Sequence, residues 1–100
     1  MVLTGEPITD EEAFRSGLVN RVTPAERCLE AAIELAGLIA GRAPVAVRLA
    51  REALRLGMET TLRDGLEIER RNYLLLYDTA DQKEGMAAFL EKRPPNFRGE

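Results

Sequence analysis

Apolar residues recur at three- and four-residue steps through most of this 100-residue chain. Such spacing places the apolar positions on one side of an α-helix, and it recurs in about five segments joined by short connections. No segment has the regular alternation of apolar and polar residues that indicates a reliable strand. The pattern therefore predicts an all-α protein of about five helices, with no internal repeat of fixed period and no boundary to a second domain.

The first helix is expected over residues 10–16, because "TDEE" has the form of a capping box between Thr9 and Glu12. Gly17 should end this helix in a left-handed conformation. The "LVNRV" that follows is β-branched enough to be extended.

The second and third helices are expected to begin at prolines. "TPAE" resembles another capping box, with Pro24 as the first residue of a helix that runs to about Ala40. Cys28, in the alanine- and leucine-rich run of this helix, is predicted to be a small buried residue. The third helix should begin at Pro44. Its apolar face is expected to include Val47, Ala50 and Leu54.

The fourth helix is expected over residues 62–77, after a cap at one of the two preceding threonines. It ends in "YLLLY", which is apolar on several sides and therefore predicted to be buried on several sides. Asp78 or Thr79 should cap the fifth helix, with Asp81 as an acid in its first turn. That helix must end before Pro94.

Composition excludes several kinds of site. The chain has 45% hydrophobic residues, no histidine, one cysteine and a net charge of −3. A Ser-His or Cys-His nucleophile and a zinc site of His and Cys ligands are excluded within one chain. The charge argues weakly against nucleic-acid or anionic-membrane partners, and no apolar run has the length of a membrane span. We therefore expect a cytoplasmic protein that is one globular domain or part of one.

The last helix carries a candidate binding face. Gly85, Phe89 and Lys92 follow one another at helical spacing and should share a side. Phe89 can stack on a flat heterocycle and Lys92 can reach a phosphate, while a helical glycine is easier to understand where something flat lies close to the backbone. The alternative is that Phe89 belongs to the core and that Lys92, in the last turn, interacts with the helix dipole.

Three stretches, in this order, resemble a known family. "LTGEPITDEEAFRSGLVNRV", "APVAVRLAREAL" and "DQKEGMAAFLEKRPPNFRG" are similar to the carboxy-terminal third of the crotonase superfamily, the enoyl-CoA hydratases and isomerases. The resemblance covers essentially all of residues 1–100, which it implies are a carboxy-terminal helical domain that lacks the family's ββα core. No single motif decides the assignment, but all of them together in register favour it.

The resemblance implies that the chemistry lies elsewhere. In this family an amino-terminal domain carries the oxyanion hole and the catalytic glutamates that add water to a trans-2-enoyl-CoA in fatty-acid degradation. Those glutamates would precede Met1, so no catalytic residue is assigned here and the chain alone is expected to be inert. No cofactor is implied, because coenzyme A is part of the substrate. Hydratase is favoured over isomerase, although the residues that distinguish them lie upstream.

The resemblance also implies two roles for the helices. The family's carboxy-terminal helices assemble subunits into trimers or hexamers and cover the CoA site, which implies a homo-oligomer. Positions that match Phe89 and Lys92 lie near the adenine and phosphate end of CoA, so these two residues are expected to bind CoA. Tyr73 and Tyr77 fall near the acyl tunnel or the helix packing, and core packing is favoured for both.

Two alternatives stay open. The first is a free-standing helical interaction module that self-associates or joins the oligomers of relatives. The second, which rests only on Phe89 and Lys92, is a nucleotide- or CoA-binding scavenger. The start at Met1 fits an expressed fragment, a truncated gene or a short natural protein. A chain cut from its core should bind a hydrophobic dye and associate, whereas an evolved module should have a discrete size.

Overall fold

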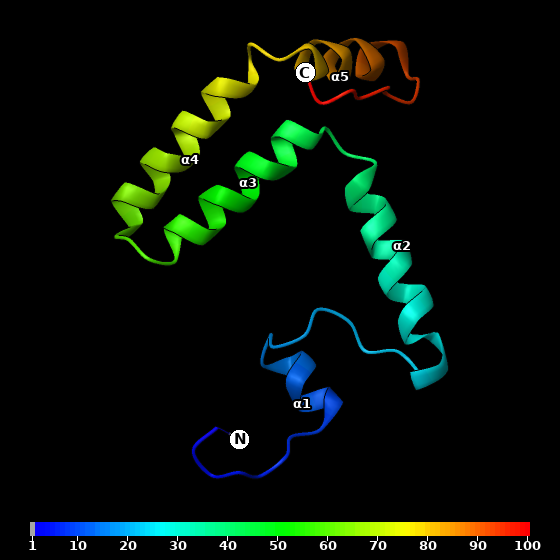
Figure 1. Cartoon of the computed structure of the whole chain (residues 1–100), viewed down its shortest axis with the longest axis vertical. Helices are drawn as coiled ribbons and strands as arrows, with labels where there is room; N and C mark the ends of the chain where they lie inside the picture. The colour runs from blue at the N-terminus through cyan, green and yellow to red at the C-terminus, as the bar shows by residue number, and fades with distance from the viewer. Residues whose placement is uncertain (1) are drawn as a thin grey trace. The chain divides into compact units, whose positions relative to one another are not determined.

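The computed structural model describes residues 2–100, and in that range the chain is helical without a strand (Figure 1). This confirms the all-α class. The elements are α1 (Asp10–Arg15), the 3-10 turn η1 (Ala25–Arg27), α2 (Cys28–Ala40), α3 (Pro44–Gly57), α4 (Leu62–Leu76) and α5 (Ala80–Glu91). The chain divides into two compact units, Met1–Leu35 and Ala36–Glu100, which are described separately below.

In the first unit, the predicted capping box of α1 is present. The N–H of Glu12 donates to the Thr9 hydroxyl at 3.2 Å, and the N–H of Thr9 donates to the Glu12 carboxylate at 2.9 Å. Gly17 has the expected positive φ of 75°. These reciprocal bonds satisfy two donors that a helix start leaves unpaired, which explains why so short a helix forms here.

The second predicted capping box is wrong. Pro24 has an extended ψ of 145° and lies before the 3-10 turn η1, for which no side chain provides a cap. Because the chain is extended at Pro24, the regular helix α2 begins only at Cys28. Cys28 is exposed rather than buried, and no residue of α2 is buried within residues 2–100. The apolar stripe of α2, which includes Leu29, Ile33 and Ile39, is therefore open to solvent in the described chain.

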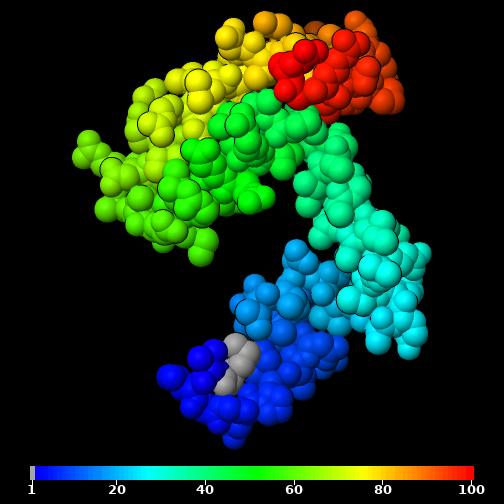
Figure 2. Space-filling model, in the orientation of Figure 1, coloured from blue at the N-terminus to red at the C-terminus, as the bar shows by residue number. Residues whose placement is uncertain are grey.

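In the second unit, α3 and α4 form an antiparallel pair that packs along its length (Figures 1 and 2). Leu49 of α3 and Asn72 of α4 are buried between them, and the Asn72 amide donates to the Leu49 carbonyl at 3.1 Å. A Cβ at Gly65 would lie 3.3 Å from the Cα of Gly57. The two backbones therefore approach closely where both residues are glycine.

The predicted apolar face of α3 is not the face that packs. Leu49 is buried, whereas of the predicted residues only Val47 is half-buried, Ala50 is exposed and Leu54 is 72% exposed. The helix has two apolar stripes, and the pairing with α4 selects the one that contains Leu49. The other stripe is left open to solvent.

The apolar end of α4 is also open. Leu74 and Leu75 are half-exposed, so the predicted burial on several sides is not found within the described chain. Tyr73 and Tyr77 are half-exposed as well, so residues 2–100 alone do not bury them, and the role of both stays a prediction. Their rings instead form an edge-to-face pair with centroids 5.3 Å apart, and their hydroxyls are 3.0 Å apart. Each ring covers part of the other because no other element covers them.

Candidate functional site

The site is built on α5, whose start is set by Thr79. The Thr79 hydroxyl accepts from the N–H of Gln82 at 3.2 Å, which makes Thr79 the cap and Asp78 the residue before it. Asp81 lies in the first turn, as predicted, but its side chain is only 3% exposed. A carboxylate buried to this degree needs hydrogen-bond donors, and these come from the end of the chain.

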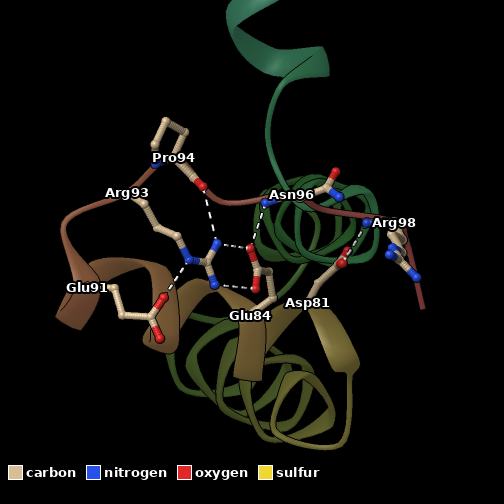
Figure 3. Close-up of polar contacts among 7 residues, drawn as sticks. All are labelled: Asp81, Glu84, Glu91, Arg93, Pro94, Asn96 and Arg98. Atoms are coloured by element: carbon tan, nitrogen blue, oxygen red, sulfur yellow. Dashed lines mark hydrogen bonds and ion pairs between the residues drawn. The ribbon is translucent and has the colours of Figure 1, made fainter.

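Residues 93–100 run back along α5 and are held there by two of its carboxylates (Figures 1 and 3). We call this group the tail latch. It consists of Asp81, Glu84, Arg93, Asn96 and Arg98.

Glu84 forms the first arm of the tail latch. Its two oxygens accept from Nη1 and Nη2 of Arg93 at 2.6 and 2.9 Å, the parallel geometry that makes arginine–carboxylate pairs strong (Figure 3). The N–H of Asn96 donates to the same carboxylate at 2.8 Å. The hydrogen bonds from Arg93 and then from Asn96 lower the pKa of Glu84 from its usual 4.5 to about 2.

Asp81 forms the second arm. Its oxygens accept from the N–H groups of Arg98 and Gly99 at 2.7 and 2.8 Å, and its own N–H donates to the Glu100 carbonyl at 3.1 Å. A Cβ at Gly99 would lie 3.4 Å from Cγ of Pro44, so the end of the tail rests on the start of α3 (Figure 2). The tail thus connects α5 to α3 although the two helices are far apart in sequence.

The flat group expected beside Gly85 belongs to the chain itself. A Cβ on Gly85 would lie 3.5 Å from Cε1 of Phe97, whose ring covers this turn of α5. That distance is an ordinary van der Waals contact, so the helical glycine is not evidence for a ligand at this turn. The surface at Gly85 is therefore occupied by the chain's own Phe97.

Lys92 lies beyond the helix rather than in its last turn. Its φ of 56° and ψ of 36° are left-handed, and it is the one non-glycine residue of the described chain with a positive φ. The N–H of Arg93 donates to the Ala88 carbonyl at 3.0 Å, and that of Lys92 donates to Phe89 at 3.3 Å. Such a conformation costs on the order of 1–3 kcal/mol for a residue with a side chain. Glycine is the usual residue at this position.

Phe89 and Lys92 are both exposed at this end of α5. Phe89 is 80% exposed, which excludes the core role considered for it within the described chain. Lys92 is in no ion pair with any of residues 2–100, whereas its neighbour Arg93 pairs with Glu84 and Glu91. The structure thus leaves an aromatic ring and a cation available for a ligand, and nothing in the chain tests whether one binds.

A second feature of this unit is an apolar groove between α3 and α4. It has a volume of about 790 Å³. On α3 its walls include residues of both apolar stripes, Leu49 as well as Ala50 and Leu54, and on the other side Leu62, Leu66 and Tyr73. An open groove of this composition is suited to an apolar partner surface.

Two kinds of site are missing from the residues that the structure describes. Across residues 2–100, no group of three or more His, Cys, Asp or Glu side chains has a geometry that would hold a metal ion. In the same range no helix has both the length and the apolar composition needed to cross a membrane.

Comparison with known proteins gives one consistent result. Residues 1–100 match the protein family described as Enoyl-CoA hydratase/isomerase. The chain is 46% identical over 99 residues to the 2,3-dehydroadipyl-CoA hydratase of Escherichia coli K12, covering 99% of this chain and 39% of that protein. It is 43% identical over 97 residues to the crotonyl-CoA hydratase of Syntrophomonas wolfei, with 97% and 37% covered.

Solved structures agree with the sequences. The crystal structure of an enoyl-CoA hydratase from Bacillus anthracis superimposes with a TM-score of 0.92 at 43% identity, covering 99% of this chain and 38% of that one. The chain therefore spans about one-third to two-fifths of the length of the relatives that it matches, from 34% to 41%.

Proposed function

The chain belongs to the enoyl-CoA hydratase/isomerase family, and from this membership we propose that residues 1–100 are the carboxy-terminal helical domain of an enoyl-CoA hydratase. The observation that carries the proposal is the match over the whole chain to between 34% and 41% of the length of the relatives. The reaction of the complete enzyme is the addition of water to a trans-2-enoyl-CoA in fatty-acid degradation.

We propose that this domain contributes no catalytic residue and is inert alone. The groups that polarise the thioester carbonyl and activate water would belong to the part of the enzyme that precedes these residues. Coenzyme A takes part as a portion of the substrate, and the proposal includes no separate cofactor. Cys28 is exposed and unpaired, which suits a reducing compartment such as the cytoplasm.

The CoA-binding residues in this proposal are Phe89 and Lys92. Their exposure supports the assignment, because an exposed ring can stack on adenine and an unpaired ammonium group can bind a phosphate. The left-handed conformation of Lys92 supports it further, since strained residues gather at ligand sites.

The second proposed role is association, with the rest of the enzyme and with other subunits in a trimer or hexamer. Within the second unit Leu54, Met58 and Leu62 are 72%, 88% and 79% exposed. Apolar side chains exposed together in this way support the proposal that another surface covers them. The open groove of α3 and α4 and the bare stripe of α2 are the candidate surfaces.

A chimera tests the proposal. The matched segment of the E. coli 2,3-dehydroadipyl-CoA hydratase is replaced by this chain, and hydration of that enzyme's own substrate is measured beside the same enzyme truncated before the segment. We expect the chimera to retain activity within about tenfold of the parent, a loss that small packing defects explain, and the truncated enzyme to be inactive. A soluble, folded chimera without activity would contradict the proposal.

The isolated chain supplies the complementary test. We expect it to hydrate no enoyl-CoA, to bind a hydrophobic dye and to associate. A discrete species that binds no dye would favour the helical interaction module instead.

A further inference from the structure

Two adjacent cations at the end of α5 have opposite environments. The guanidinium of Arg93 donates to both oxygens of Glu84 and, through Nε, to Glu91 at 2.6 Å (Figure 3). Lys92 is exposed and has no ion-pair partner within residues 2–100. The charge of Arg93 is therefore paired within the chain, whereas the charge of Lys92 is free to bind a ligand.

The conformation of Lys92 is determined from both sides. On the helix side, its N–H donates to the Phe89 carbonyl, and the N–H of Arg93 donates to the Ala88 carbonyl at 3.0 Å. On the tail side, Glu84 fixes the Arg93 side chain and also accepts from the N–H of Asn96 at 2.8 Å. The chain between the helix and the tail therefore has to turn at Lys92, which takes the left-handed conformation.

The turn alone does not require a lysine. Glycine would make the same turn without strain, and no described residue pairs with the lysine charge to compensate for that strain. Strained residues that the surrounding structure holds in place are found at ligand-binding sites. Lys92 is strained in this way, and its charge has no partner within residues 2–100.

We propose that Glu84 and Arg93 are positioning residues for Lys92. Their ion pair holds the left-handed turn at Lys92, so that the backbone from which the ammonium group reaches a phosphate of a CoA thioester is already ordered before binding. This inference rests on the proposed assignment of Phe89 and Lys92 to CoA binding. It adds that the latch, and not the helix end alone, determines the strength of that binding.

The test is a coupling measurement on the full 100-residue chain. Affinity for CoA is measured by calorimetry for wild type, Glu84→Gln, Lys92→Ala and the double variant. Glu84→Gln keeps the size of the side chain and one acceptor but removes the charge that binds Arg93. The control is Glu67→Gln on α4, because Glu67 pairs with Arg70 at 2.7 Å through two hydrogen bonds as Glu84 does with Arg93, although Glu67 has no hydrogen bond to the tail and is more exposed.

We expect Lys92→Ala to weaken CoA binding about tenfold, the loss of one charge-assisted hydrogen bond. Glu84→Gln should weaken it at least about threefold. The double variant should bind no more weakly than Lys92→Ala, and Glu67→Gln should bind as wild type does. This non-additivity distinguishes a residue that acts through Lys92 from one that only stabilises the fold.

Each of the other outcomes contradicts a specific part of the proposal. If Lys92→Ala weakens binding while Glu84→Gln does not, the latch has no positioning role and the CoA site remains. If the two losses multiply in the double variant, Glu84 does not act through Lys92. If wild type binds no CoA or Lys92→Ala changes nothing, the CoA assignment fails and the positioning role fails with it. Should Glu84→Gln lose its helical circular dichroism, Arg93→Lys replaces it, because lysine keeps the charge and loses the paired geometry.

Discussion

At the scale of single residues, Lys92 is where stability and the proposed function oppose each other. Its left-handed backbone is unfavourable for lysine and natural for glycine. We expect Lys92→Gly to raise the free energy of unfolding by about 0.5–1 kcal/mol, measured by urea denaturation, because it relieves strain. The same variant should lose affinity for CoA. A variant that is destabilised would show that the lysine side chain supports the fold instead.

Glu84 gives a pH dependence whose direction follows from its lowered pKa. The carboxylate titrates near 4.5 when unfolded and near 2 when folded, since Arg93 and Asn96 bind its charged form. Its contribution to stability is thus complete above about pH 4.5 and is lost as the pH falls toward 2. We expect the melting temperature of wild type to fall across this range more steeply than that of Glu84→Gln. Parallel acid curves for the two proteins would contradict the ion pair.

At the scale of elements, the approach of α3 and α4 depends on Gly65, whose Cα lies against the backbone of Gly57. A Cβ at Gly65 would lie 3.3 Å from the Gly57 backbone, which leaves no room for a larger side chain. We expect Gly65→Leu to lower the free energy of unfolding by about 1–3 kcal/mol through overpacking. Gly37→Leu in α2 is the control, because nothing lies within 4 Å of its Cβ position, and it should stabilise the chain slightly. Equal effects of the two variants would mean that the helices separate easily.

The elements also show what the sequence alone can predict. The starts of α1, α4 and α5 were predictable because Thr9, Thr61 and Thr79 bond to N–H groups three residues away. The failed box at Thr23 has the same spacing of threonine and glutamate as the box at Thr9, but Pro24 after it is extended. A short motif of this kind does not determine the backbone conformation. Local bonds were therefore predicted well, except where the backbone departed from the helix.

Contacts between distant residues were the ones that sequence reasoning missed. The packed face of α3 depends on Asn72, 23 residues away from Leu49, so two apolar stripes looked equivalent. The Glu84–Arg93 and Asp81–Gly99 contacts span 9 and 18 residues. The only available signal for the latch was the order of an acidic helix, two prolines and a basic tail. The candidate pair Phe89 and Lys92 was suggested first by helical spacing and then by the family resemblance, and its role stays a prediction.

At the scale of the whole molecule, the second arm of the tail latch holds residues 98–100 against the rest of the unit Ala36–Glu100. Asp81 is buried and accepts from two N–H groups of the tail. We expect Asp81→Ala to cost about 2 kcal/mol of stability, because it removes two bonds to a charged group and leaves their donors unpaired. Hydrogen exchange should then accelerate at Arg98 and Gly99 more than at Asn72. Uniform acceleration would mean that the tail unfolds only with the whole unit.

The last prediction concerns the surface that the chain leaves open. Leu54 is 72% exposed in the groove of α3 and α4, so a charge there should not harm the isolated fold but should prevent an apolar partner from docking. We expect Leu54→Glu to reduce dye binding and association of the chain, measured by fluorescence and sedimentation velocity. Leu3→Glu is the control, because Leu3 is 99% exposed outside the groove and the chemical change is the same. If both variants associate as wild type does, the groove is not the surface that other parts of the enzyme cover, and the bare stripe of α2 becomes the candidate.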